Sequence, residues 1–311
     1  MQVSVVITVL NEAHSLPLLC HALAIQTKPP AEVLIVDGGS SDASDEVLKR
    51  CQTSYPHIAL KIIHQPGNRS VGRNAGIKVA NNDWIAITDA GCEPTQTWLA
   101  ELCAAQKTTR ADVVAGYYQG LASSPLAEAI IPYVLVMPDR VNPANFLPAT
   151  RSMMLKRAVW QQLGGFDERF SHNEDYVFAR RLVTSKFSIT FAQNAVVLWH
   201  PRTTLTSFAH MIYRFAVGDA EAKCYRPKVW LLFGRYGLLT AMLSLTARTA
   251  GIIPATWLTL GLFCLYSGWA IAKNYRYTKH GWYWLPILQI LSDIMILIGT
   301  MVGLTRQKTS T

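Results

Sequence analysis

The chain has 311 residues, enough for one large domain or two smaller ones, and half of them are hydrophobic. Its formal net charge is +9, but the basic residues do not spread over one folded face as nucleic-acid binding requires, so we expect no nucleic-acid partner. The six cysteines show no C-x-x-C pair and no zinc-ligand spacing, which argues against a zinc site.

The first part of the chain, to about residue 225, alternates short apolar runs with polar loops. The apolar runs predict strands at Val3–Val9, Glu32–Asp37, Ile58–Ile63, Trp84–Asp89 and Asp112–Ala115. The segments between them predict helices at Ser15–Gln26, Asp42–Cys51, Arg69–Asn81 and Thr95–Lys107. Because strands and helices alternate at this spacing, we expect an α/β domain with a parallel or mixed sheet covered on both faces.

Two of these strands end on an aspartate that small residues follow, Asp37 and Asp89. Ligands of open α/β sheets bind beyond the carboxyl ends of the strands, so we expect one shared site for a polar, phosphorylated ligand. Asp37 could accept hydrogen bonds from a base or ribose, or could only cap the next helix. Asp89 could bind a divalent cation that bridges two phosphates, or could likewise be a cap.

The segment after these strands is less regular, because five prolines divide Leu121–Ala149 into loops and short helices. Beyond it, the pattern predicts a strand at Met153–Lys156, a helix at Asn173–Thr184, strands near Ile189 and at Val196–Trp199, and an amphipathic helix at Thr203–Glu221. Glu174 and Asp175 stand at the start of the predicted helix Asn173–Thr184, where acids also complement the helix dipole. His200 follows the last strand, where it could be a ligand or a packed structural histidine.

Residues 226–311 indicate a membrane-associated region. Gly251–Ala272 has no charged residue and Gly281–Leu304 has only Asp293, and each run is long enough to cross a hydrocarbon core of roughly 30 Å. Buried core helices are the alternative. Val229–Ala247 could be a third crossing, but Arg235 makes it costly, and an interfacial helix explains it as well.

The distribution of basic residues predicts the orientation. If only the two runs cross, seven basic residues lie outside them and three between them, namely Lys223, Arg226, Lys228, Arg235, Arg248, Arg306 and Lys308 against Lys273, Arg276 and Lys279. The positive-inside rule then predicts a multi-pass protein of the cell membrane whose N-terminal domain faces the cytoplasm.

Taken in order, the motifs of residues 1 to about 222 resemble those of the family 2 glycosyltransferases of the GT-A fold. The resemblance is carried by Val5–Glu12, Val36–Asp42, Arg73–Ile77, Thr88–Gly91, Gly164–Glu168, Glu174-Asp175 and Trp199-His200. It implies a GT-A nucleotide-diphospho-sugar transferase sheet with helices on both faces in residues 1–225, followed by transmembrane helices in residues 226–311.

The resemblance also implies a role for individual residues. The nucleotide-sugar pocket would be lined by Thr8, Asn11, Glu12, Asp37, Gly39, Arg73 and Asp89, with Asp37 on the base and Arg73 near the donor phosphates or ribose. Asp89 would bind Mg²⁺ or Mn²⁺, with His200 as an additional contact. Asp175 would be the general base, with Glu174 beside it in the catalytic pair.

The chain departs from the family pattern at Gly91, where the metal motif often has a second aspartate. One carboxylate is therefore missing, and Glu93 or His200 could complete the metal site. Variants with Asp-Ala-Gly occur in the family, so the departure does not imply inactivity.

The expected activity is transfer of a sugar from a nucleotide-diphosphate donor, a UDP-sugar, to a hydroxyl or phosphate of a lipid or glycan acceptor, with inversion. Membrane lipid is a further expected partner. A sugar-phosphate nucleotidyltransferase is one alternative, although Thr8–Ser15 lacks the basic, glycine-rich loop of such enzymes. A catalytically degenerate membrane scaffold is another, with Gly91 as its only support. A dehydrogenase is excluded, because no G-x-G-x-x-G follows the first strand.

Overall fold

The computed structural model describes residues 1–307, which form two compact units. The first unit contains Met1–Leu121 and Leu135–His200, and the second contains Ala122–Val134 and the chain from Pro201 onward. Each unit is described by itself below. The helix at Leu205–Glu221, which the sequence motifs join to the first region, belongs to the second unit.

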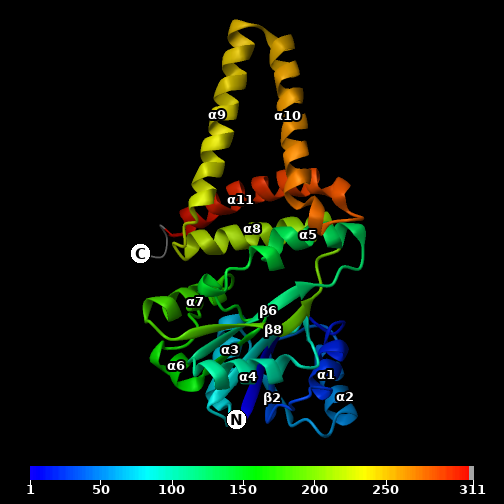
Figure 1. Ribbon diagram of the computed structural model, residues 1–311, viewed down its shortest axis with the longest axis vertical. Helices are drawn as coiled ribbons and strands as arrows, with labels where there is room; N and C mark the ends of the chain where they lie inside the picture. Colours follow the sequence, from blue (N-terminus) through cyan, green and yellow to red (C-terminus); the bar gives the residue numbers. More distant parts are fainter. Residues whose placement is uncertain (308–311) are drawn as a thin grey trace. The chain divides into compact units, whose positions relative to one another are not determined.

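The first unit is built on one sheet of eight strands in the order β3-β2-β1-β4-β7-β6-β8-β5 (Figure 1). The strands are β1 (Val3–Val9), β2 (Glu32–Asp37), β3 (Leu60–His64), β4 (Trp84–Asp89), β5 (Cys92–Pro94), β6 (Val113–Gly120), β7 (Met153–Lys156) and β8 (Ile189–Trp199). The first four strands pair in parallel, whereas β7 and β5 run antiparallel to their neighbours. The mixed sheet expected from the sequence is confirmed.

Helices cover both faces of this sheet. They are α1 (Leu16–Ala24), α2 (Ser44–Ser54), α3 (Arg69–Val79), α4 (Trp98–Thr109), α6 (Arg157–Gln162) and α7 (Glu174–Thr184), with 3₁₀ turns η1 (Pro138–Arg140) and η2 (Pro143–Asn145). Ile77, Val159 and Phe178 bring α3, α6 and α7 into one buried cluster that also contains Met153. The neighbouring Ser152 accepts a hydrogen bond of 2.9 Å from the indole of Trp98 in α4. Because successive residues of a strand face opposite sides, α4 covers the other face.

Strand β8 is continuous, whereas the sequence predicts two separate strands there. Residues 189–199 form the single strand β8 rather than two strands, because the register against β6 shifts between Gly116 and Tyr117 and pairing then resumes. For the same reason β6 extends to Gly120, beyond the predicted end at Ala115. An irregularity of this kind bends a strand without ending it.

The second unit is helical. It contains α5 (Pro125–Val134), α8 (Leu205–Glu221), α9 (Pro227–Thr249), α10 (Ile252–Asn274) and α11 (Leu285–Gln307), with η3 (Tyr275–Tyr277) and η4 (Trp282–Trp284) between the last two. Helices α9 and α10 form an antiparallel hairpin, while α11 lies alongside α8 (Figure 1). By length and composition, three segments could cross a membrane, Pro227–Thr249, Ile252–Tyr277 and Trp282–Gln307.

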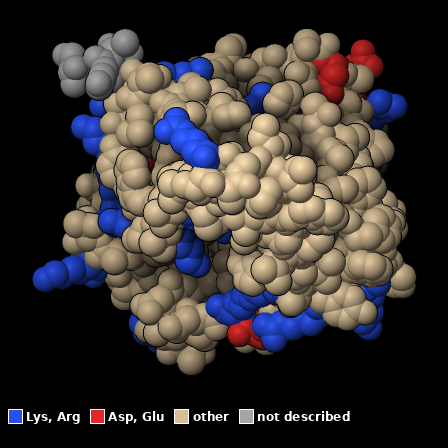
Figure 2. All heavy atoms as spheres, turned by 90° about the horizontal axis from the view of Figure 1, so that it is seen from above, with Lys and Arg blue, Asp and Glu red and all other residues tan. Residues whose placement is uncertain are grey.

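The surface seen along the hairpin, from above Figure 1, has a broad area without charged side chains (Figure 2). Lys and Arg side chains are far more visible in this view than Asp and Glu. An uncharged surface with basic residues around it is typical of contact with a membrane.

Candidate functional site

The carboxyl ends of the parallel strands align along one edge of the sheet. Thr8 pairs in register with Asp89, Val9 with Asp37, and Asp37 with His64. The two aspartates at strand ends therefore stand one strand apart, separated by the end of β1. Asp37 and Asp89 therefore lie at the same edge of the sheet, as the sequence predicts.

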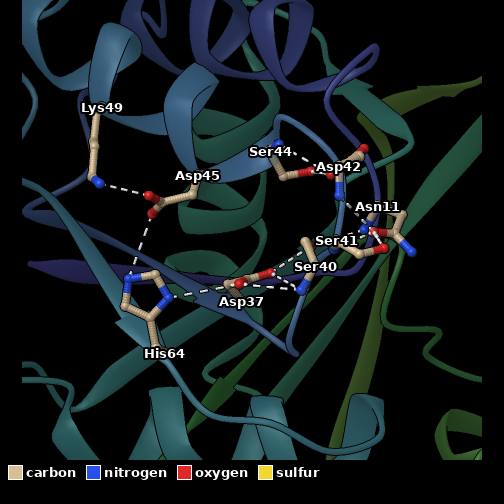
Figure 3. A network of polar contacts seen from close by, with 9 residues as sticks. All are labelled: Asn11, Asp37, Ser40, Ser41, Asp42, Ser44, Asp45, Lys49 and His64. Carbon is tan, nitrogen blue, oxygen red and sulfur yellow. Dashed lines mark hydrogen bonds and ion pairs between the residues drawn. The ribbon is translucent and has the colours of Figure 1, made fainter.

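Asp37 organises the loop that follows β2 (Figure 3). Its carboxylate accepts hydrogen bonds from the backbone N–H of Ser40 at 3.1 Å and from the Ser40 hydroxyl at 2.5 Å. His64 Nδ1 lies 3.6 Å from the other carboxylate oxygen. Asp37 is 5% exposed, so its contacts hold Gly39, with a φ of 100°, in a fixed loop.

Asn11 joins the loop after β1 to the loop after β2 (Figure 3). Its side-chain oxygen accepts hydrogen bonds from the backbone N–H groups of Ser41 at 2.8 Å and Asp42 at 3.3 Å. The backbone N–H of Glu12 donates to the Ser44 hydroxyl at 2.9 Å. Asn11 has a φ of 56°, in the left-handed region where asparagine is among the few residues favoured. The two loops thus form one rigid rim.

Two glycines of α3 allow this helix to approach β1 closely. A Cβ added at Gly72 would lie 2.8 Å from Thr8 Cγ2, and one added at Gly76 would lie 2.7 Å from Val6 Cγ1. Larger residues at either position would push α3 away from the sheet. The close approach places Arg73, which is 1% exposed, beneath the end of β4.

Arg73 bridges two carboxylates from different elements. Its Nη1 donates to Glu174 Oε1 at 2.5 Å, and its Nη2 donates to Asp89 Oδ1 at 2.9 Å. Glu174 is 3% exposed. The planar guanidinium suits this double contact, and it fixes β4, α3 and the start of α7 relative to one another. A buried charge is stable only with such partners.

The pKa values of Asp175 and Asp89 are shifted in opposite directions. Burial raises the pKa of the Asp175 carboxyl above its ordinary value, and the negative charge of Glu174 adds to this effect. Burial also acts to raise the pKa of Asp89, but the positive charges of Arg73, Arg69 and Arg151 outweigh it, and the Asp89 pKa is lowered. Acids with pKa values moved apart can divide the roles of proton acceptor and permanent anion.

Arg151 also lies in the site, close enough for its charge to act on Asp89, although no sequence motif indicates it. Its guanidinium lies 5.6 Å from the ring centroids of both Tyr118 and Trp199. The Thr88 hydroxyl donates to the Arg151 carbonyl at 2.9 Å, which holds this residue beside the end of β4. Within residues 1–307 the structure shows no hydrogen bond donated by the Arg151 guanidinium, so its N–H groups are available for an anion.

His200 and Glu93 form a separate pair at this edge. His200 Nε2 contacts Glu93 Oε1, because β5 and β8 pair with Glu93 opposite Leu198. The space beside Gly91 is open, since a Cβ added there would meet no atom within 4 Å. Across residues 1–307 no three His, Cys, Asp or Glu side chains are grouped so that they could hold a metal ion by themselves.

Residues 4–125 match the family model of Glycosyl transferase family 2. Glycosyltransferase AglE of Haloferax volcanii is 26% identical to this chain over 237 residues, which is 74% of each protein.

Two solved structures share the fold. Mannosyltransferase PcManGT from Pyrobaculum calidifontis, in complex with GDP-Man and Mn²⁺, superposes with a TM-score of 0.64 at 18% identity, covering 95% of this chain and 87% of that protein. TarS residues 1–349 of S. aureus in complex with UDP gives a TM-score of 0.53 at 15% identity, covering 100% and 92%. The GT-A sheet expected from the motifs is therefore confirmed.

Proposed function

We propose that this chain, whose residues 4–125 match glycosyl transferase family 2, is a member of that family and transfers a sugar from a nucleotide-diphosphate donor to an acceptor at a membrane. The observation that carries the proposal is the linked set Asp89–Arg73–Glu174, with Asp175 beside it at the carboxyl edge of the sheet. This set offers an anion for a cation–phosphate complex and a separate proton acceptor.

The nucleotide would bind over the rim formed by the loops after β1 and β2. In this proposal Thr8, Asn11, Glu12 and Gly39 line the pocket, and Asp37 accepts a hydrogen bond from the base. Support comes from the fixed geometry of these loops and from the bound nucleotides in the two similar structures, GDP-Man in one and UDP in the other. We propose a UDP-sugar as the donor.

A divalent cation fits the residues at the end of β4. Asp89 Oδ1 is occupied by Arg73, but in residues 1–307 no hydrogen bond reaches its other oxygen, Oδ2. Mg²⁺ and Mn²⁺ sites on nucleotides need only one or two carboxylates, since phosphate oxygens and water supply the other ligands. Asp89 would hold the ion, with His200 as a further contact. When bound, the ion would neutralise negative charge on the leaving diphosphate.

Arg151 would supply a second positive charge to the same diphosphate. Its aromatic neighbours hold the guanidinium in place without using its hydrogen-bond donors. An arginine presents several N–H groups in one plane, which suits phosphate oxygens. Because Gly91 takes the place of an acid in the metal motif, the metal would be held more weakly. The Arg151 contact would then neutralise part of the negative charge of the diphosphate.

Asp175 would remove the proton from the acceptor hydroxyl as it attacks the anomeric carbon of the sugar. A carboxyl whose pKa is raised by burial and by Glu174 is a better proton acceptor than an ordinary aspartate. Attack from the side opposite the diphosphate inverts the configuration at that carbon. Glu174 would hold Arg73 and tune the pKa of its neighbour. The apolar second unit favours a lipid or a membrane-presented glycan as acceptor.

A donor panel tests this proposal. The full-length protein in detergent is mixed with UDP- and GDP-sugars in Mg²⁺ or Mn²⁺, and release of nucleoside diphosphate is measured with a lipid extract as acceptor. We expect one donor to be turned over, and to stop turning over when EDTA is added. Absence of both binding and turnover with every donor would refute the proposal. Binding without turnover would favour the degenerate scaffold.

A further inference from the structure

Helix α11 packs against α8 through residues that have little or no side chain. A Cβ added at Gly299 would lie 2.6 Å from the Tyr213 carbonyl oxygen, and one added at Gly303 would lie 2.6 Å from Ala220 Cβ. The helices therefore touch backbone to backbone, as helices do through small residues four apart. Because the contacts advance together along both helices, α8 and α11 run parallel and side by side.

Both ends of α11 are attached to this same helical layer. Before its start, the Glu128 carboxylate of α5 accepts three backbone N–H groups at 3.2, 2.9 and 3.0 Å, from Lys279, His280 and Gly281. The Tyr133 hydroxyl, also in α5, donates to the Leu285 carbonyl at 2.9 Å. At the other end, Arg306 Nη1 lies 3.3 Å from Glu221 Oε1 at the end of α8. The start and the end of α11 thus lie at one level.

This attachment is incompatible with α11 crossing a bilayer. A crossing α11 would take α8 with it, and the C-terminal half of α8 carries the charged side chains Arg214, Asp219 and Glu221. Such groups are rare and costly in hydrocarbon. The free side of α11 is nevertheless apolar, with Ile287, Ile294, Ile298 and Met301 between 39% and 51% exposed. A helix with one packed side and one exposed apolar side suits the plane of a membrane interface.

A buried polar cluster joins the hairpin to α11. Asp293 of α11 is 3% exposed. It accepts hydrogen bonds from Arg235 Nη2 at 2.7 Å and the Tyr236 hydroxyl at 3.0 Å, both in α9, and from the Tyr266 hydroxyl in α10. The positive charge of Arg235, which makes α9 costly as a crossing helix, is therefore paired with Asp293 of α11.

The length of the hairpin beyond this cluster matches a bilayer. From Tyr236 to Thr249 and from Tyr266 back to Ile252, each helix extends roughly 20 Å at 1.5 Å per residue. The thickness of α11 with its side chains adds about 10 Å, and the total is close to the roughly 30 Å hydrocarbon core. Aromatic residues at the level of α11, which favour an interface, are Tyr275, Tyr277, Trp282, Tyr283 and Trp284.

We propose that α9 and α10 cross the membrane as a hairpin, while α8 and α11 lie in the plane of the leaflet at which α9 enters. The C-terminal end of α11 then returns to that same side. The charge distribution agrees, because the hairpin tip carries only Arg248, whereas the entry side carries Lys223, Arg226, Lys228, Lys273, Arg276, Lys279 and Arg306. This arrangement differs from the two crossings, Gly251–Ala272 and Gly281–Leu304, expected from hydropathy.

Cysteine labelling in sealed vesicles of both orientations tests the proposal. The background is the full chain with Cys224→Ser and Cys264→Ala, because the other four cysteines are buried. Single cysteines are introduced by Ala250→Cys at the hairpin tip, Thr305→Cys near the end of α11, and Lys279→Cys as the entry-side reference, all at exposed positions. A membrane-impermeant maleimide is added before and after solubilisation.

We expect the cysteines at positions 279 and 305 to be labelled in one vesicle orientation and the cysteine at position 250 only in the other. Labelling at position 305 together with position 250 would mean that α11 crosses, and labelling at position 250 together with position 279 would mean that the hairpin turns back; either result overturns the proposal. Protease digestion of an epitope tag placed after residue 311 reports the side of the C-terminus independently of the cysteine substitutions.

Discussion

Replacing Arg73 with methionine should destabilise the first unit strongly. Arg73 is 1% exposed and is the partner of Glu174 at 2.5 Å and Asp89 at 2.9 Å. Methionine fills similar space but leaves the Glu174 carboxylate, 3% exposed, without its cation. Removing one partner of a buried ion pair costs about 3–5 kcal/mol. For a unit of this size, that loss lowers the melting temperature by roughly 6–20 °C.

Thermal unfolding of the full chain in detergent measures this change, with Arg169→Met as the matched control. Arg169 also pairs with an aspartate, Asp167, at 2.7 Å, but its side chain is 83% exposed, so we expect no change beyond measurement error. A melting temperature of Arg73→Met within 2–3 °C of the wild type, roughly 1 kcal/mol, would refute the reasoning.

The pH dependence of the Arg73→Met effect gives a second check. In the wild type, burial acts to raise the pKa of Asp89, but Arg73 and the other basic neighbours outweigh this effect. The pKa of Asp89 is therefore lowered. The stability gained from this lowered pKa is therefore present above the unfolded value of about 3.9 and is lost as the pH falls through the folded pKa. The difference between wild type and variant should therefore shrink as the pH is lowered below about 3.9, and a difference that grows there would contradict this account.

Three further predictions concern the reaction. The apparent pKa of the acid limb of the kcat/KM profile should lie above the ordinary aspartate value of about 3.9. Glu174→Gln removes a negative charge beside Asp175 and should move this limb to lower pH; an unchanged limb would exclude Asp175 as the titrating base. Gly91→Asp, at a position with open space, should lower the Mn²⁺ concentration needed for half-maximal donor binding, and no change would place the metal elsewhere. Arg151→Met should weaken donor binding by roughly 10-fold or more, the loss of one charged hydrogen bond, while Arg169→Met should not; equal binding would remove Arg151 from the diphosphate site.

Most of the sheet and its covering helices could be predicted from local patterns. Val3–Val9 and Trp84–Asp89 are apolar runs with clear ends, and both are strands with the predicted bounds. The sequence predicts two strands in place of β8, because Gln193 and Asn194 interrupt the apolar pattern. A polar interruption and a bulge look alike in a single sequence, since only the partner strand shows that pairing resumes.

Arg235 shows what a local pattern cannot contain. In the sequence it is a charge inside an apolar segment, which argued against α9 as a crossing helix. In the structure Asp293 neutralises it at 2.7 Å, from a helix much later in the chain. Pairing between distant residues decides the cost of such a charge, and one sequence without its fold does not supply the pair.

The candidate site likewise contains residues that the sequence indicates and one residue that only the fold reveals. Asp37, Asp89 and Arg73 stand at strand ends or in motifs that the resemblance covers, and the structure brings them to one edge. Arg151 precedes β7, an antiparallel strand, and the start of an antiparallel strand lies at the same edge as the ends of its parallel neighbours. This reversal could not be predicted from the apolar run Met153–Lys156 alone, so Arg151 was missed.

Asp175→Asn, compared with the wild type in both sugar transfer and donor binding, tests the central claim most directly. Asparagine keeps the size of the side chain but cannot accept the acceptor proton. We expect transfer to fall by about 10²–10⁴-fold, while the Kd for the donor, measured by calorimetry with Mn²⁺ present, stays within about twofold, a change of less than 0.5 kcal/mol. Transfer at the wild-type rate would contradict the assignment of Asp175 as the base.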